Sequence, residues 1–145
     1  MQTFLSQTAE YALRAVARVA AQPPDQPLLA RDLAADTRIP PEYLSKILRR
    51  LVLGGILVSR RGRGGGFGLA RAPGSLRLRD VLTAVDAFPR AGRCAFGLQA
   101  CSDKHPCALH TGWSRLSADF HRWATETTLE HVRKNPTRIV PGRGR

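Results

Sequence analysis

Apolar residues recur at spacings of three and four through the first part of the chain, which is the pattern of helices with one buried side. Residues 6–21 predict a first helix on this ground. A linker at residues 22–27 contains three prolines and ends it, and residues 28–36 predict a second, short helix. The apolar side of the first helix comprises Ala9, Ala12, Leu13, Val16, Ala17 and Ala20, opposite Arg14 and Arg18.

A third helix is expected over about residues 40–51, where two prolines suit a first turn and two glycines follow the end. Its apolar stripe is separate from a polar, basic side. Two short helices joined by a brief turn, the second with an exposed basic side, predict a helix-turn-helix. The candidate DNA-binding residues of this third helix are Tyr43, Ser45, Lys46, Arg49 and Arg50.

Two short apolar segments, residues 56–59 and 67–70, predict the strands of a hairpin. The residues between them are three arginines and four glycines. Glycine lets a backbone approach phosphates closely, and arginine can fork onto a phosphate or enter a minor groove. The hairpin therefore predicts a wing that contacts DNA, with the candidate residues Arg60, Arg61, Gly62, Arg63, Gly64 and Gly65.

Two further helices are predicted in the second half of the chain. Residues 76–88 carry apolar residues at helical spacing and are expected to join the core. Residues 111–132 predict the longest helix, along which a narrow apolar seam continues to Thr127. Such a seam either packs on its own domain or pairs with a second subunit. We favour a dimer, with Trp113, Leu116, Phe120 and Trp123 at the interface.

These elements predict a mainly α fold with a small β-hairpin: a winged helix-turn-helix domain with a long C-terminal dimerisation helix. The expected division is a DNA-binding domain over 1–90, a cysteine-rich loop over 91–110, the dimerisation helix over 111–134 and a basic, disordered tail over 135–145.

The charge of the chain supports a polyanionic partner. The formal net charge of the 145 residues is +12, and residues 43–79 contain nine Lys or Arg and no Asp or Glu. A charge run alone often marks a solvated surface, but this one coincides with the two elements expected to face a duplex. We find no signal peptide and no membrane span in the sequence, and we expect a cytoplasmic protein.

All three cysteines of the chain lie in one short segment, at Cys94, Cys101 and Cys107, and His110 follows closely. Three soft ligands and an imidazole indicate a zinc ion or an iron–sulfur cluster. Only the last cysteine and His110 have the spacing usual in structural zinc sites, whereas a cluster tolerates wider spacers. Buried, reduced cysteines without a ligand are the third interpretation.

The chain resembles the IscR-type winged-helix transcription regulators, a group that includes nitric-oxide-responsive NsrR members. The resemblance covers about residues 1–134. It includes T-A-E-Y-A-L-R at 8–14, I-P-P-E-Y-L-S-K-I-L at 39–48, R-G-R-G-G-G-F at 61–67, L-R-D-V-L-T-A-V-D at 78–86, and three cysteines before the long helix.

The resemblance implies a dimeric regulator whose iron–sulfur cluster alters its binding to promoter DNA. C-A-L-H-T-G-W at 107–113 is most like the IscR members, so Cys94, Cys101, Cys107 and His110 are the implied ligands of a two-iron cluster. The first spacer has six residues instead of five, which leaves a four-iron cluster open. Glu10 matches the acidic ligand that NsrR-like members supply from the partner subunit, and is the alternative fourth ligand.

We therefore expect a DNA-binding transcriptional regulator, as a repressor, that senses iron, redox state or nitric oxide. The alternatives are a zinc-stabilised regulator without redox sensing and a small electron-transfer protein. No constellation of residues indicates an enzyme or a small-molecule substrate.

Overall fold

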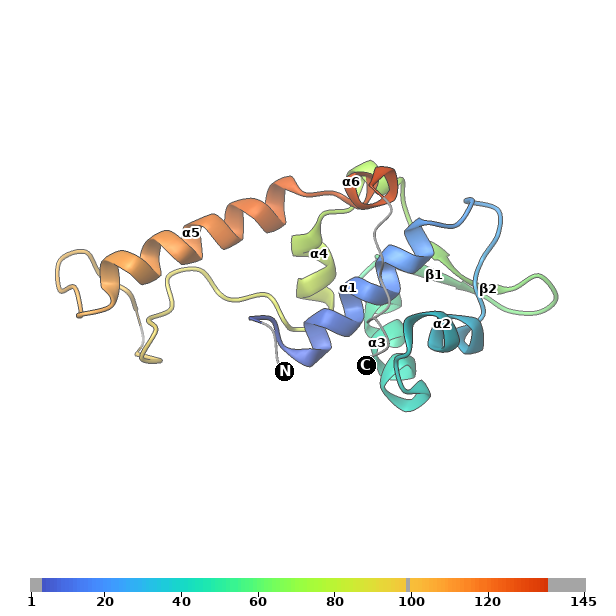
Figure 1. The fold of residues 1–145 in the computed structure, drawn as a ribbon, viewed down its shortest axis with the longest axis horizontal. Helices are drawn as coiled ribbons and strands as arrows, with labels where there is room; N and C mark the ends of the chain where they lie inside the picture. Colours follow the sequence, from blue (N-terminus) through green and yellow to red (C-terminus); the bar gives the residue numbers. More distant parts are fainter. Residues whose placement is uncertain (1–3, 99, 136–145) are drawn as a thin grey trace, which may run out of the picture.

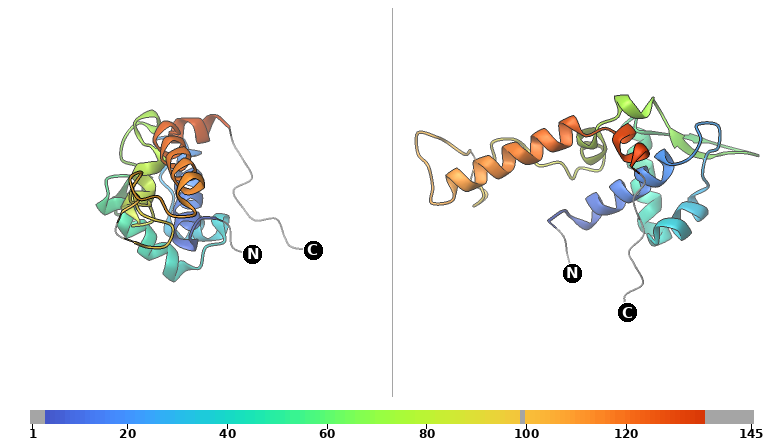
Figure 2. Two further views of the ribbon diagram at one scale, coloured as in Figure 1. Left: turned by 90° about the vertical axis from the view of Figure 1, so that its left-hand side faces the viewer. Right: turned by 45° about the horizontal axis from the view of Figure 1, so that its top comes forward.

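The computed structural model describes residues 4–98 and 100–135. Helices and a hairpin form a body, and one long helix extends away from it (Figure 1). The right-hand view of Figure 2 shows from another side that this helix and the loop before it stand apart from the body. The elements are α1 (Gln7–Ala20), α2 (Ala30–Thr37), α3 (Pro41–Leu53), β1 (Leu57–Arg60), β2 (Gly66–Leu69), the 3-10 helix η1 (Pro73–Ser75), α4 (Leu78–Ala84), α5 (His110–Glu126) and α6 (Leu129–Lys134).

Helix α1 is the centre of the body. The Ser6 hydroxyl accepts a hydrogen bond from the Ala9 N–H and caps the first turn. Small residues on its buried side let α2, α3, α4 and α6 pack against it. The large, fully buried side chains around it include Leu33, Leu48, Leu51, Ile56, Leu76 and Leu82.

The helix-turn-helix predicted from the sequence is confirmed as α2 and α3. Arg38, between them, adopts a left-handed conformation with φ 54°, and Ile39 after it is buried. Two arginines of α1 fix the end of α2: Arg14 donates to the Thr37 carbonyl at 3.1 Å, and Arg18 pairs with Asp36 at 2.8 Å. The orientation of α3 on the body is set by this turn and by its buried stripe.

The hairpin is also confirmed, and it has a third partner. Strands β1 and β2 pair antiparallel from Leu57 with Leu69 to Arg60 with Gly66. Leu28, just before α2, exchanges both backbone hydrogen bonds with Phe67, at 2.9 and 2.7 Å. Gly66 makes this approach possible, because a Cβ there would lie 2.5 Å from the Leu28 carbonyl oxygen. The base of the wing is therefore tied to the start of the helix-turn-helix.

The single helix expected over residues 111–132 is wrong, because the chain is extended between α5 and α6. Thr127 and Thr128 have β-region torsion angles, and the Thr128 hydroxyl caps α6. The break lets the backbone pair with the segment before α4: Leu78 donates to Thr127 at 3.0 Å, and Leu129 donates to Leu76 at 2.9 Å. Leu129 is thereby buried, and α6 packs on α1 and η1.

The helix expected over 76–88 is shorter than predicted, since α4 ends at Ala84 and Asp86 has a positive φ of 57°. The tail predicted over 135–145 lies outside the described residues after Asn135. Within the described ranges, no helix is long and apolar enough to cross a bilayer.

Gly66→Ala should destabilise the protein by about 1–3 kcal/mol, because φ is +136° and the new Cβ would press against the Leu28 carbonyl. Gly68→Ala in the same strand is the control, since nothing lies within 4 Å of its Cβ position, and a change within about 0.5 kcal/mol is expected. Urea unfolding measures both. Equal effects would contradict the tight contact between Leu28 and the wing.

Candidate functional site

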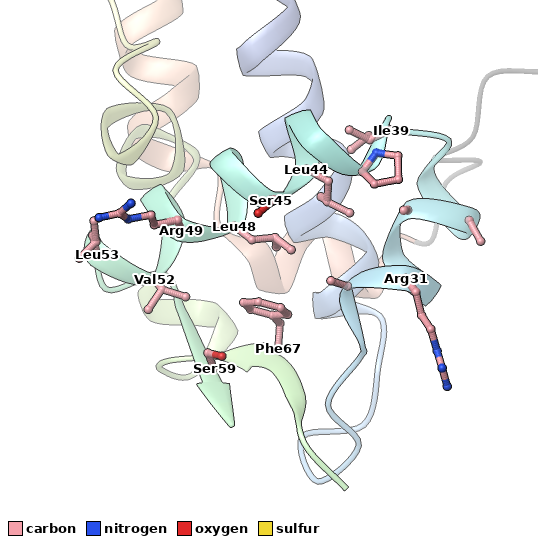
Figure 3. Close-up of a pocket in the computed structure, with 14 residues that line it drawn as sticks. Arg31, Ile39, Leu44, Ser45, Leu48, Arg49, Val52, Leu53, Ser59 and Phe67 are labelled. Atoms are coloured by element: carbon pink, nitrogen blue, oxygen red, sulfur yellow. The ribbon is translucent and has the colours of Figure 1, made fainter. Parts of the chain in front are cut away.

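The exposed side of α3 lies beside a groove formed with α2 and the hairpin. The groove has a volume of about 820 Å³, and its apolar wall includes Leu44, Leu48 and Phe67 (Figure 3). Ser45 and Arg49, both predicted to bind DNA, lie at its edge. Ser45, Lys46 and Arg49 are exposed, and within the described residues no hydrogen bond or ion pair engages them. These three side chains are therefore free to meet a ligand.

Two other predicted residues of α3 also have contacts within the protein. Tyr43 is 50% exposed, and its ring meets the Tyr11 ring edge-on with centroids 6.4 Å apart. Arg50 donates to the Val85 carbonyl at 3.2 Å, which joins α3 to the end of α4. Arg50 thus contributes to the packing of α3, independently of any contact with DNA.

The wing presents its arginines as the sequence predicts. Arg60, Arg61 and Arg63 are exposed. Gly62 and Gly64 have φ values of 86° and 73°, which suit the turn between the strands. Gly65, also predicted to contact DNA, is buried and donates its N–H to the Gly62 carbonyl at 3.0 Å.

Gly65 therefore has a structural role in the hairpin. A side chain there would clash with the Arg60 carbonyl, and its N–H is already used. The glycine run thus shapes the turn that displays the arginines, with Gly62 and Gly64 at its exposed part.

The cysteine loop lies at the N-terminal end of α5, away from the wing (Figure 1). Cys94 is buried, Cys101 and Cys107 are half-buried, and all three are free thiols. Cys101 Sγ lies 3.0 Å from His110 Nδ1. Burial raises the pKa of the Cys101 thiol, and the nearby Cys94, Cys107 and Asp103 raise it further. Cys101 and His110 are thus in contact, and Cys94 and Cys107 lie near enough to Cys101 to influence its thiol.

The loop is attached to the helix that follows it. The Trp113 indole N–H donates to the Arg93 carbonyl at 2.7 Å, and the Cys101 N–H donates to the Gly92 carbonyl at 2.8 Å. His110 is the first residue of α5. Among the described residues, no three His, Cys, Asp or Glu side chains converge as a ready metal site, so joint binding by all four candidates requires the loop to tighten.

Glu10 is placed apart from these four side chains. It lies in the first turn of α1. The N-terminal end of α1 is below the C-terminal half of α5, whereas the cysteine loop is at the other end of α5 (Figure 1). The resemblance to NsrR-like members implies that Glu10 would reach a cluster from a second subunit.

The predicted dimer seam is partly covered by its own chain. Trp113 and Phe120 are half-buried, whereas Leu116 and Trp123 are 47% and 44% exposed. Phe120 packs between Phe4 and Phe88, with centroids 6.0 Å from each. Along α5 only Ala124 is fully buried, so most of the helix is open to a partner. The dimer interface stays a prediction.

A helix-turn-helix with an arginine-bearing hairpin, carried on a helical body, defines a winged-helix DNA-binding protein. The family model of Rrf2, described as iron-dependent transcriptional regulators, matches residues 5–135. The chain belongs to the Rrf2 family and is a transcriptional regulator.

Curated relatives and solved structures agree with this assignment. The HTH-type transcriptional regulators IscR of Yersinia pseudotuberculosis and Xenorhabdus nematophila are each 31% identical over 131 residues, which is 90% of this chain and 79% of the relative.

Among solved structures, the global cysteine regulator CymR of B. subtilis has a TM-score of 0.76 at 20% identity, covering 94% of this chain and 100% of that one. IscR of T. potens has a TM-score of 0.74 at 19% identity, covering 99% and 96%. These two likenesses support the fold. One of these two proteins is named as a cysteine regulator, and the other as an IscR.

Sequence reasoning missed one residue of the site. Asp103 Oδ1 lies 2.7 Å from His110 Nε2, on the opposite side of the ring from Cys101. Asp103 is in an irregular loop, so no periodicity relates it to His110. Its only signal was its position between two candidate ligands, Cys101 and Cys107.

Arg49→Ala and Arg50→Ala should separate DNA contact from packing. Loss of Arg49 should weaken DNA binding by about 1–3 kcal/mol if it contacts a base, without lowering stability, because its side chain is exposed. Loss of Arg50 should lower stability by about 0.5–1.5 kcal/mol, because the bond to Val85 is lost. Fluorescence anisotropy and thermal unfolding measure the two effects. If Arg50→Ala has normal stability but binds DNA weakly, Arg50 contacts DNA and its packing role is wrong.

Proposed function

We propose that this Rrf2-family regulator is a repressor whose binding to promoter DNA is controlled by an iron–sulfur cluster. The proposed ligands are Cys94, Cys101, Cys107 and His110. The observation that carries the proposal is the 3.0 Å approach of Cys101 Sγ to His110 Nδ1, in the loop that also holds the free thiols of Cys94 and Cys107. Thiolates and imidazole are ligands of iron–sulfur clusters, so the donor set fits the group.

We favour His110 over Glu10 as the fourth ligand, and hence a two-iron cluster over a four-iron one. His110 is next to a candidate cysteine ligand within the same chain, whereas Glu10 lies on α1, and the resemblance implies that it would act from a partner subunit. The start of α5 also suits an anionic group. Its first turn has no acidic residue, and among the described residues no side-chain hydrogen bond caps it.

A homodimer is the proposed DNA-binding form. The exposed Leu116 and Trp123 form an apolar surface on a helix that projects from the body, where a second copy can reach it (Figure 1). Large apolar side chains of this kind favour an interface. Two winged domains would then read half-sites separated by about 34 Å or a multiple of it.

The regulatory step follows from the continuity of the loop and α5. A bound cluster supplies iron sites that can be oxidised, nitrosylated or lost. His110 begins α5, and Trp113 holds the Arg93 carbonyl, so a change in the loop acts directly on the first turns of the proposed dimer helix. A reorientation of α5 changes the placement of the two α3 helices. Coupling of about 1–3 kcal/mol would change DNA affinity roughly 5- to 150-fold.

Protein isolated without oxygen should be coloured and contain iron and sulfide. Cys94→Ser, Cys101→Ser and Cys107→Ser should each abolish the visible absorption, while the far-UV circular dichroism stays that of a folded protein. Promoter binding of these variants should match that of the cluster-free wild type.

Two results would contradict the proposal. Colourless protein that holds zinc and unfolds with a chelator would favour the zinc-stabilised regulator. Iron-loaded protein without affinity for a duplex at moderate salt would favour an electron-transfer role, against the family assignment.

Arg63→Ala should weaken binding to all DNA sequences about equally and reduce the slope of log K against log salt by about 1, because one phosphate contact is lost. Arg122→Ala is the matched control. It removes one exposed arginine that pairs with Asp119 on α5, away from the wing. Unchanged binding of Arg63→Ala to random DNA would exclude the wing from the interface.

A further inference from the structure

The ring of His110 is held from both sides by polar groups of the same loop. Nδ1 faces Cys101 Sγ at 3.0 Å, and Nε2 faces Asp103 Oδ1 at 2.7 Å. The His110 side chain is only 12% exposed, although it begins an exposed helix. The imidazole plane is therefore fixed between a sulfur atom and a carboxylate.

The two partners differ in what they can donate. Asp103 Oδ1 can accept a hydrogen bond, so the tautomer of His110 with its hydrogen on Nε2 satisfies the 2.7 Å contact. In the neutral imidazole the other nitrogen, Nδ1, then has a free lone pair. That lone pair is directed toward Cys101, which is one of the thiols gathered in the loop.

We propose that Asp103 is the positioning residue of His110: it holds the hydrogen on Nε2 and keeps Nδ1 facing Cys101, so that Nδ1 would be the atom that binds iron. This inference rests on the proposed function, because it assumes that His110 is a ligand. It adds two details to that function: Nδ1 of His110 as the iron-binding atom, and Asp103 as a residue outside the cysteine and histidine pattern.

The position of Asp103 makes this role separable from a structural one. Its side chain is 98% exposed, and it has no part in the hydrophobic core. Metal-binding histidines generally donate their second ring N–H to a carboxylate or carbonyl, which sets the orientation of the ring and raises its basicity. Removing such a partner typically lowers metal affinity about 10- to 100-fold.

The first measurement uses full-length protein without metal. Nitrogen-15 spectra of the histidine rings should show His110 with its hydrogen on Nε2. In Asp103→Ala the His110 signals should move toward a mixture of the two tautomers. Asp103→Asn should largely retain the wild-type signals, because an amide oxygen can accept the same hydrogen bond.

The second measurement uses reconstituted protein. Asp103→Ala should lose its cluster to a chelator about 10- to 100-fold faster than wild type. Pulsed electron paramagnetic resonance of the reduced cluster should show an altered coupling of the ring nitrogen remote from iron. The chelation rate and the nitrogen coupling of Asp103→Asn should lie between those of wild type and those of Asp103→Ala. Asp119→Asn, which removes an exposed carboxylate of α5 outside the loop, is the control and should behave as wild type.

The outcomes separate this inference from the function on which it rests. Wild type that takes up no cluster overturns the proposed function, and the tautomer measurement still tests the hydrogen bond. A normal cluster in wild type, with unchanged tautomer and chelation rate in folded Asp103→Ala, overturns the role of Asp103 alone. Loss of the cluster in Asp103→Ala but not in His110→Ala would make Asp103 a ligand, contrary to the proposal.

Discussion

A short backbone pairing between two distant segments determines the architecture of this protein. Residues on either side of Arg77 exchange hydrogen bonds with Thr127 and Leu129, and the Arg77 side chain also donates to the Thr125 carbonyl. This pairing interrupts what would otherwise be one long helix. It returns α6 to α1 and leaves α5 anchored by its C-terminal end. The free end of α5 then carries the cysteine loop, and this places the candidate metal site far from the wing.

The separation makes α5 the physical link between the candidate metal site and the DNA-binding surface. One end of the helix begins at His110, and the other is joined to α4, with Phe120 packed on Phe88 after α4. Arg50 connects α3 to the end of α4 through the Val85 carbonyl. A continuous chain of contacts therefore runs from the loop along α5 to α4, and from α4 to the helix that carries the candidate reading residues.

The sequence predicted the elements whose information is local. Periodicity and the proline and glycine boundaries located α1, α2, α3 and the hairpin, and the clustering of three cysteines located the loop. The break at Thr127 was missed because apolar spacing continues across it, although a threonine in the capping position before Leu129 was a visible signal. Asp103 contacts His110 within an irregular loop, and Arg50 contacts Val85 far along the chain, so no periodic pattern in the sequence encodes either contact.

The backbone pairing of Leu28 with Phe67 has a mechanical consequence. Because the base of the wing is hydrogen-bonded to the residue that leads into α2, the hairpin cannot swing independently of the helix-turn-helix. In the proposed dimer, each subunit would present one stiff surface to a duplex. Under that proposal, a change at the cysteine loop would act through α5 on the distance and tilt between the two surfaces, and not by bending the wing within one subunit.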